Sequence, residues 1–180
     1  MAGMKLLAIT LLLFPVICLA DRAITDPDTL PNTNYVEEAP WEENAAKLPA
    51  YPRNENLLPF NVSSATNNKF MIDAASISVG NDRIVRYTVV IESPRGARTV
   101  NYEGLRCATM ERKIYAFGQS DGKWSENKRA AWEGIKLRSL LSYHKALAED
   151  IFCDLEVPIW NAEEGIGNLR RGKAESLRHD

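Results

Sequence analysis

Histidine and cysteine are scarce in this sequence, with two histidines and three cysteines among 180 residues. They show no familiar metal-ligand spacing, and no phosphate-binding loop with Gly-Lys-Ser or Gly-Lys-Thr is present. No Gly-x-Ser-x-Gly motif precedes a helix, and the run around Gly118, Asp121 and Gly122 resembles only fragments of such loops. We therefore expect no metal, no cofactor and no catalytic residue of these classes. The net charge of −2 lacks the basic excess typical of nucleic-acid binding, so no nucleic-acid partner is expected.

The composition is that of an ordinary globular chain. Hydrophobic residues make up 45% and charged residues 26%, which excludes wholesale disorder, a collagen-like repeat and a protein of many membrane spans. A chain of 180 residues allows one domain with an appendage.

The N-terminus is typical of a signal peptide. Lys5 precedes an uncharged run from residue 6 to residue 19, and small residues precede a cut after Ala20. The run is shorter than the roughly 20 residues of a membrane span. We predict that residues 1–20 are removed between Ala20 and Asp21, that no membrane span remains, and that the protein reaches the periplasm or cell envelope. A retained anchor, or a lipoprotein acylated on Cys18, is the alternative.

Removal of this leader leaves two cysteines, Cys107 and Cys153. In an oxidising compartment such a pair usually forms a disulfide. A bridge between them would stabilise the fold by roughly 4 kcal/mol in the chain-entropy model. We therefore predict a structural disulfide.

Residues 21–60 are predicted to form an extended acidic arm. They hold six of the nine prolines and carry a charge of 3 − 8 = −5, and proline excludes long helices. They also carry large apolar side chains that a disordered linker normally lacks. The part from Trp41 to Phe60 is therefore either a strap packed on its own domain or a segment that waits for a partner.

Residues 61–160 are predicted to form an α+β domain. Alternation with a period of two and turn signals indicate strands over residues 70–79, 84–92, 98–108 and 112–117, with a bulge at Glu103-Gly104. Short connections make neighbours antiparallel, so a four-stranded meander is expected. Ser125 is predicted to cap a helix that carries Trp132, and Ser139 a second helix that carries His144. Both helices should pack on one face of the sheet, and the tail over residues 161–180 should fray apart from a loose helix over residues 169–178.

A cluster of basic residues lies on the predicted strands and turns. Its members are Arg86, Arg95, Arg98, Arg106, Arg112 and Lys113. Such cations could hold the acidic arm, which an acidic ligand could displace, or they could be scattered surface charges of little energetic consequence. Arg86 and Arg98, together with Trp41 of the arm, are the candidate binding residues. His144 lies on the predicted buried stripe, where a structural ring is expected more often than a general base.

Short motifs along most of the chain resemble a known family. They are Trp41-Glu42-Glu43, Leu48-Pro49-Ala50-Tyr51-Pro52, Glu55-Asn56-Leu57-Leu58-Pro59-Phe60, Val85-Arg86-Tyr87, Ser93-Pro94 with Gly96-Ala97-Arg98, Tyr102-Glu103-Gly104 with Arg106-Cys107, and Phe152-Cys153. This pattern resembles the CNP-one-like family of uncharacterised proteobacterial envelope proteins over about residues 41–155. The resemblance implies the compartment and the bridge, and no catalytic residues. The order of elements is also distantly similar to that of surface-adhesin protein E of Gram-negative pathogens.

These observations favour an exported, non-enzymatic, monomeric module of the periplasm or envelope. We expect it to bind an envelope or secreted protein or peptide through the arm or the open sheet face, or to play a structural role. The alternative is a small periplasmic hydrolase or transferase with an unrecognised site. A cleft that joined His144 to a carboxylate and a nucleophile would favour this alternative.

Overall fold

The computed structural model describes residues 40–172. The predicted leader with its cut between Ala20 and Asp21, the first part of the arm, and His179 lie outside the described residues. No helix within residues 40–172 has the length and apolar character needed to cross a membrane.

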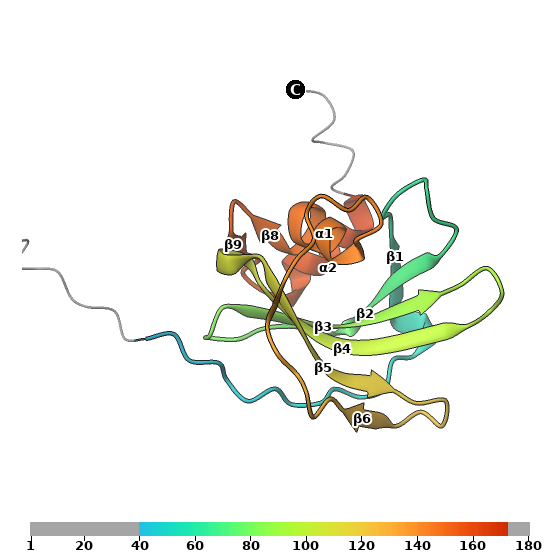
Figure 1. Cartoon of the computed structure of the whole chain (residues 1–180), viewed down its shortest axis with the longest axis horizontal. Coiled ribbons are helices and arrows are strands. Elements are labelled where there is room, and N and C mark those ends of the chain that lie inside the picture. Colours follow the sequence, from blue (N-terminus) through green and yellow to red (C-terminus); the bar gives the residue numbers. More distant parts are fainter. Residues whose placement is uncertain (1–39, 173–180) are drawn as a thin grey trace, which may run out of the picture. The chain divides into compact units, whose positions relative to one another are not determined.

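One antiparallel sheet of seven strands dominates the described residues (Figure 1). Six strands follow one another in space as they do in sequence, and the seventh pairs with the opposite end of β5. The strands are β1 (Leu57–Phe60), β2 (Lys69–Val79), β3 (Ile84–Glu92), β4 (Arg98–Arg106), β5 (Glu111–Gly118), β6 (Trp124–Glu126) and β7 (Glu133–Gly134).

The sequence pattern located the four central strands, β2 to β5, correctly. A bulge also lies in the predicted region, because the register between β4 and β5 shifts after Tyr102. The extra residue is Tyr115 on β5, however, and not Glu103-Gly104 on β4. Asn101 and Leu105 face the helices while Tyr102 and Gly104 face the opposite side, and both faces are buried. This two-sided burial explains the apolar side chains in both phases of β4.

The prediction of four strands was wrong, because three further strands pair at the edges of the meander. β1 comes from the end of the predicted arm. β6 and β7 come from the segment that was predicted to be a helix starting at Ser125. That segment is extended because its backbone pairs with β5 at Trp124–Glu126 and again at Glu133–Gly134.

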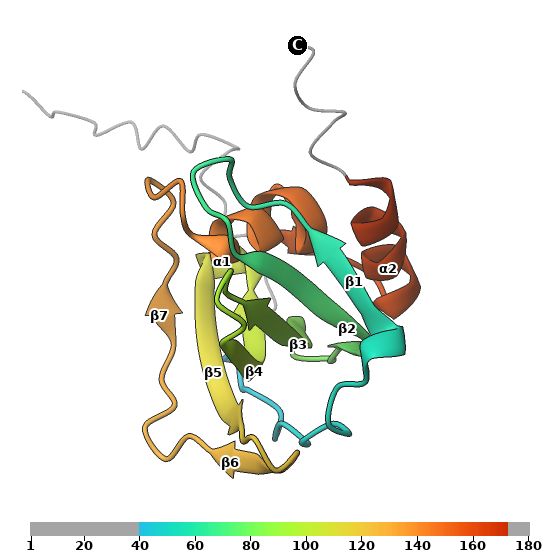
Figure 2. The same ribbon diagram turned by 90° about the vertical axis from the view of Figure 1, so that its right-hand side faces the viewer.

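Two helices cover one face of the sheet, as predicted. The first lies within the predicted helix that carries His144, whereas the second occupies residues outside both predicted helices. The first, α1 (Tyr143–Ala146), is capped by Ser142 and not by Ser139, and it continues as a π-helical segment over Leu147–Phe152. The second, α2 (Ala162–Arg171), begins at the cap Asn161 and lies beside β1 and β2 (Figure 2). It occupies residues that we expected to fray, and its Leu169 is buried in the core. A short hairpin of β8 (Cys153–Asp154) and β9 (Val157–Pro158) joins the two helices.

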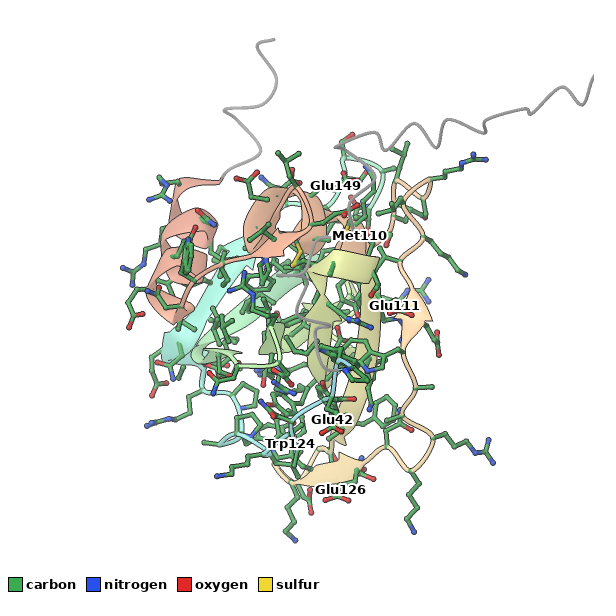
Figure 3. The ribbon with its side chains drawn as sticks, turned by 90° about the vertical axis from the view of Figure 1, so that its left-hand side faces the viewer. Glu42, Met110, Glu111, Trp124, Glu126 and Glu149 are labelled. Carbon is green, nitrogen blue, oxygen red and sulfur yellow. A yellow bond between two sulfur atoms is a disulfide. The ribbon has the colours of Figure 1, made fainter. Side chains whose placement is uncertain are left out.

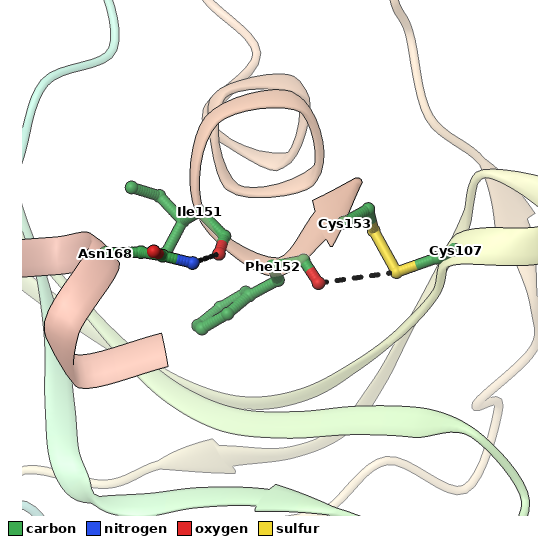
Figure 4. The surroundings of a disulfide bond; sticks show 5 residues. All are labelled: Cys107, Ile151, Phe152, Cys153 and Asn168. Carbon is green, nitrogen blue, oxygen red and sulfur yellow. Dashed lines mark hydrogen bonds between the residues drawn. A yellow bond between two sulfur atoms is a disulfide. The ribbon is translucent and has the colours of Figure 1, made fainter. Parts of the chain in front are cut away.

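The core fills the space between the helices and this face of the sheet. Tyr87 of β3 packs against Phe152 with ring centroids 5.0 Å apart, and both side chains are fully buried. Cys107, just after β4, is joined to Cys153, just after the π-helical segment, by a disulfide (Figure 4). In the same region, the Asn168 side chain of α2 donates a hydrogen bond of 2.8 Å to the carbonyl oxygen of Ile151. The bridge and this hydrogen bond fix the helical layer to the sheet.

Candidate functional site

Residues 40–52, which we call the strap, cross the sheet face that lies opposite the helices (Figure 1). The expectation of an open sheet face is therefore wrong for the area that the strap covers. We call this area the strap face and define it by Arg86, Tyr102, Lys113, Tyr115 and Trp124. Figure 3 draws the side chains as sticks, viewed from the left-hand side of Figure 1, and labels Glu42, Trp124 and Glu126.

Tyr115 owes its position on the strap face to the bulge and to a glycine opposite. A Cβ atom on Gly104 would lie 2.5 Å from the Tyr115 hydroxyl oxygen and 2.8 Å from its ring, so only glycine leaves room for this ring. The Tyr115 ring lies 5.5 Å from the ring of Tyr102 and 5.8 Å from the Arg86 guanidinium. The strap face is thus both aromatic and cationic.

Every third residue of the strap turns toward the domain. Glu43, Ala46 and Pro49 are half-buried between exposed neighbours, and Pro52 is buried. A period of three residues is that of a polyproline II helix, whereas a strand has a period of two. The strap consequently presents one edge to the face and makes no strand ladder with it.

Glu43 is the main polar anchor of the strap. Its carboxylate accepts hydrogen bonds from Lys113 Nζ at 2.8 Å, from the Tyr115 hydroxyl at 2.9 Å and from Trp132 Nε1 at 3.0 Å. Burial alone would raise the pKa of Glu43, but these three hydrogen bonds and the charge of Lys113 outweigh it and hold that pKa below its usual value. Burial, together with the hydrogen bond to Glu43, raises the pKa of Tyr115. Glu43 therefore remains ionised when the strap is docked at neutral pH.

Trp41 closes the N-terminal end of the strap. Its ring lies under the Arg106 guanidinium at 3.9 Å and meets the edge of the Trp132 ring with centroids 6.2 Å apart. Its Nε1 donates a hydrogen bond of 2.8 Å to the carbonyl oxygen of Asp82. The predicted candidate Trp41 thus binds within its own chain, on the basic cluster to which Arg106 belongs.

Arg86 binds the strap backbone through the Nη2 atom of its guanidinium group. It forms a buried ion pair of 2.6 Å with Asp82 and also donates a hydrogen bond of 2.9 Å to the carbonyl oxygen of Asn44. Asp82 in turn accepts a hydrogen bond from the Asn44 amide at 2.9 Å. Burial alone would raise the pKa of Asp82, and the hydrogen bonds from Arg86 and Asn44 lower it below its usual value. The buried Asp82–Arg86 ion pair therefore binds both backbone groups of Asn44, with Asp82 accepting from its N–H and Arg86 donating to its C=O.

The C-terminal end of the strap lies on aromatic rings. Trp124 Nε1 donates a hydrogen bond of 2.9 Å to the carbonyl oxygen of Pro49, and the ring of Trp124 lies 5.4 Å from that of Tyr51. The Tyr51 hydroxyl donates to the carbonyl oxygen of Gln119 at 2.8 Å. This end is held by indole and phenol donors.

Two cavities flank the middle of the strap, where its side chains are small. One, of about 370 Å³, lies between Ala45, Ala46 and the side chains of Lys113, Tyr115 and Glu126. The other, of about 240 Å³, lies on the side of Ala45 that faces Ser78, Arg86 and Tyr102. The strap therefore fills the strap face only in part.

The structure brings two of the three predicted binding residues onto one face. Trp41 belongs to the strap, and Arg86 belongs to the strap face and binds the strap. Arg98 lies outside the strap face, where it donates a hydrogen bond of 3.3 Å to Asn54. Sequence reasoning missed Glu43, Trp124 and Trp132 as parts of this site. The available signal was a strap that carries both carboxylates and prolines, opposite strands that carry cations and aromatic side chains.

His144 forms a second polar cluster on the other face of the sheet. Its Nε2 lies 3.0 Å from Glu103 Oε2, and Glu103 also accepts hydrogen bonds from Tyr87 at 3.2 Å, Asn101 at 3.1 Å and Tyr143 at 2.7 Å. Each carboxylate oxygen of Glu103 therefore has two hydrogen-bond partners, so all four acceptor positions of the group are occupied. Burial alone would raise the pKa of Glu103, and the hydrogen bond and charge of His144 lower it below its usual value. The cluster is consistent with the predicted structural role of His144.

The described contacts of this cluster do not form a triad with a hydroxyl or thiol nucleophile. In the described part of the chain, the side-chain hydrogen bonds of Glu103 and His144 involve no serine, threonine or cysteine. The Gly-x-Ser-x-Gly spacing, of which we expected only fragments, is complete from Gly118 to Gly122. However, it forms the turn between β5 and β6, and a nucleophile elbow joins a strand to a helix.

Comparison with known proteins places the chain in a family. The model of the CNP1-like family matches residues 36–170, and the chain belongs to that family. The matched range contains the whole strap, the whole sheet, Cys107 and Cys153, and nearly all of α2. No curated protein and no solved structure matched the chain.

Proposed function

We propose that this protein is an exported, non-enzymatic module of the periplasm or cell envelope that binds an extended segment of a protein partner on the strap face. The observation that carries the proposal is the docked strap. Side chains of the domain bind the Glu43 carboxylate, the backbone of Asn44 and the carbonyl of Pro49. The two backbone contacts are ones that any extended peptide could make. The domain thus holds a peptide ligand that happens to belong to its own chain.

Two observations and one resemblance support the compartment. The N-terminal residues have the pattern of a cleaved leader, the two remaining cysteines form a disulfide, and disulfides persist in oxidising compartments. The resemblance to envelope proteins points the same way. We propose a monomer that meets its partner in the envelope.

Crosslinking and pull-down of the exported protein from its own cells tests this function. We expect one stoichiometric partner, captured more strongly by a Glu43→Gln variant, whose strap is loosened, than by the wild type. Glu42→Gln is the matched control, because Glu42 is the exposed neighbour of Glu43. Recovery of monomer alone, from both wild type and Glu43→Gln, would count against a binding role.

A different surface could carry the capture, and a second variant separates the two. Leu155, at the tip of the β8–β9 hairpin, is 93% exposed, and nearby Trp160 is 77% exposed. If Leu155→Ser abolished capture while Trp124→Ala left it intact, the partner would bind the hairpin and the assignment to the strap face would be wrong.

Within the described residues, the Glu103–His144 pair is the observation that favours the enzymatic alternative. It requires a substrate-dependent activity that His144→Gln removes without unfolding the protein. Because Ser120 stands at the centre of the Gly-x-Ser-x-Gly spacing, Ser120→Ala in the same assay would reveal a serine nucleophile.

A further inference from the structure

We infer that the strap face is a binding site for proline-rich segments in the polyproline II conformation. Its partner is such a segment of another protein, which displaces the strap. This inference rests on the function proposed above and specifies the partner's chemistry. The strap then acts as an internal competitor for the site.

The contacts at the C-terminal end of the strap have the features of polyproline II recognition. Pro49 and Pro52 are spaced as Pro-x-x-Pro, one turn of that helix, and both turn toward the domain. A polyproline II helix has no internal hydrogen bonds, so its carbonyl groups are free to accept them. Trp124 supplies such a donor at 2.9 Å from Pro49 O and an aromatic surface against which Tyr51 packs.

A carboxylate pocket lies two turns before the first proline. Glu43 precedes Pro49 by six residues, which is about 19 Å at the rise of a polyproline II helix. There it meets a cation and two neutral donors, Lys113, Tyr115 and Trp132. The site therefore selects for an acidic side chain at this distance before a Pro-x-x-Pro unit.

The unfilled cavities favour a partner other than the strap. Ala45 and Ala46 leave about 240 Å³ and 370 Å³ beside them, and longer side chains at the two equivalent positions would fill this space. The strap compensates for its poor fit by being attached, since a tethered ligand acts at an effective concentration in the millimolar range. A better-fitting segment of another protein can then displace it.

Fluorescence anisotropy with the full exported chain tests the inference. The first probe is a labelled peptide with the sequence of residues 40–53, and the second carries Ala45→Gln and Ala46→Leu. We expect the Glu43→Gln protein to bind the first probe about tenfold more tightly than the wild type does, because its strap competes less well. We expect the second probe to bind more tightly than the first, and Trp124→Phe, added to Glu43→Gln, to weaken both about fivefold.

The contrary results separate the inference from the proposed function. A probe with Pro49→Ala and Pro52→Ala that binds as tightly as the first would overturn the inference that the site recognises proline. The proposal that the strap face binds a peptide would stand. A second probe no tighter than the first would overturn the argument from the cavities. A dimer that exchanges straps, seen by light scattering of Glu43→Gln, would identify a second copy as the occupant. Faster trypsin cleavage at Lys47 would show that the strap of Glu43→Gln is released. If neither probe then bound this variant, the proposed function itself would be contradicted.

The titrations require that Glu43→Gln is folded. Thermal unfolding by circular dichroism checks that Glu43→Gln is folded. If it is not, Trp41→Ala loosens the strap from its other end and takes its place in the same titrations.

Discussion

Glu103 on β4 and His144 on α1 are joined across the interface between sheet and helix by a hydrogen bond of 3.0 Å. The Glu103 side chain is fully buried, and four donors surround it. A buried carboxylate is tolerated only when its oxygens are hydrogen-bonded, and here each oxygen accepts two hydrogen bonds. The pair therefore fixes where the short helix sits on the sheet.

Replacement of Glu103 by glutamine should destabilise the fold by about 2 to 4 kcal/mol. The amide would place its own N–H hydrogens against groups that already donate, which leaves buried donors without acceptors. Urea denaturation at pH 7 measures the loss. Glu126→Gln, at an exposed carboxylate of β6, is the control and should change stability by no more than about 0.5 kcal/mol. Equal midpoints for the two variants would contradict the assignment.

The same carboxylate predicts how stability depends on pH. The pKa of Glu103 in the folded protein lies below its ordinary value of 4.5, so the folded state binds fewer protons than the unfolded state does in this range. Its contribution is complete above pH 4.5 and is lost as the pH falls through the lowered pKa. Wild-type stability should therefore fall more steeply below pH 4.5 than that of Glu103→Gln. Asp73, whose pKa burial raises, is present in both proteins and cancels in the comparison. Parallel profiles would contradict the prediction.

Loss of the Glu43 charge should release the strap without unfolding the domain. Glu43→Gln weakens the hydrogen bonds to Lys113, Tyr115 and Trp132, and we expect a loss of about 1 to 2 kcal/mol because the group is partly exposed. Trypsin should then cleave after Lys47 several-fold faster, while cleavage within the sheet stays slow. Glu42→Gln should leave both measurements unchanged. If the two variants were cleaved equally fast, the strap would not depend on Glu43.

The sequence predicted the central sheet because each of its strands carries a local signal. Period-two alternation over β3 and the turn residues after β3 gave the strand bounds, and the cysteine pair gave the bridge. The apolar residues in both phases of β4 were interpreted as a bulge on that strand, whereas they reflect burial on both of its faces. What covers the second face was left open between a strap and a segment that waits for a partner, since the choice depends on contacts between residues about 40 to 90 positions apart.

The failures have identifiable physical reasons. Trp132 and Ile135 have a helical spacing, but they are held in an extended segment by long-range bonds, from Trp132 Nε1 to Glu43 and from the Ile135 amide to Met110 O. Tertiary contacts overrode a weak local pattern there. For α2, a local signal was present: the cap Asn161, acidic residues in the first turn, basic residues in the last turn and Gly172 with φ of 58° at its end. The glycines within this helix obscured that signal.

The disulfide should contribute about 2 to 4 kcal/mol to the stability of the fold. Replacing both Cys107 and Cys153 by serine should lower the denaturation midpoint, and reductant should lower the midpoint of the wild type but not that of the variant. Mass spectrometry of the exported protein with and without reductant gives the oxidation state. Two free thiols in that protein would contradict the bridge and remove one support for the compartment.

Two glycines of α2 should respond to alanine with opposite signs. A Cβ atom on Gly165 would lie 2.8 Å from Ile159 Cδ1 and 3.2 Å from Phe152 Cε1, both in the buried core, whereas one on Gly167 would meet only the flexible end of Arg171 at 3.3 Å. Alanine favours the helix by roughly 0.5 to 1 kcal/mol at either position. Gly167→Ala should therefore stabilise the protein by about that amount. In Gly165→Ala, overpacking of about 1 to 3 kcal/mol should outweigh the gain. Thermal denaturation of both variants measures the difference, and a similar gain at both positions would mean that α2 does not pack on Ile159 and Phe152 in solution.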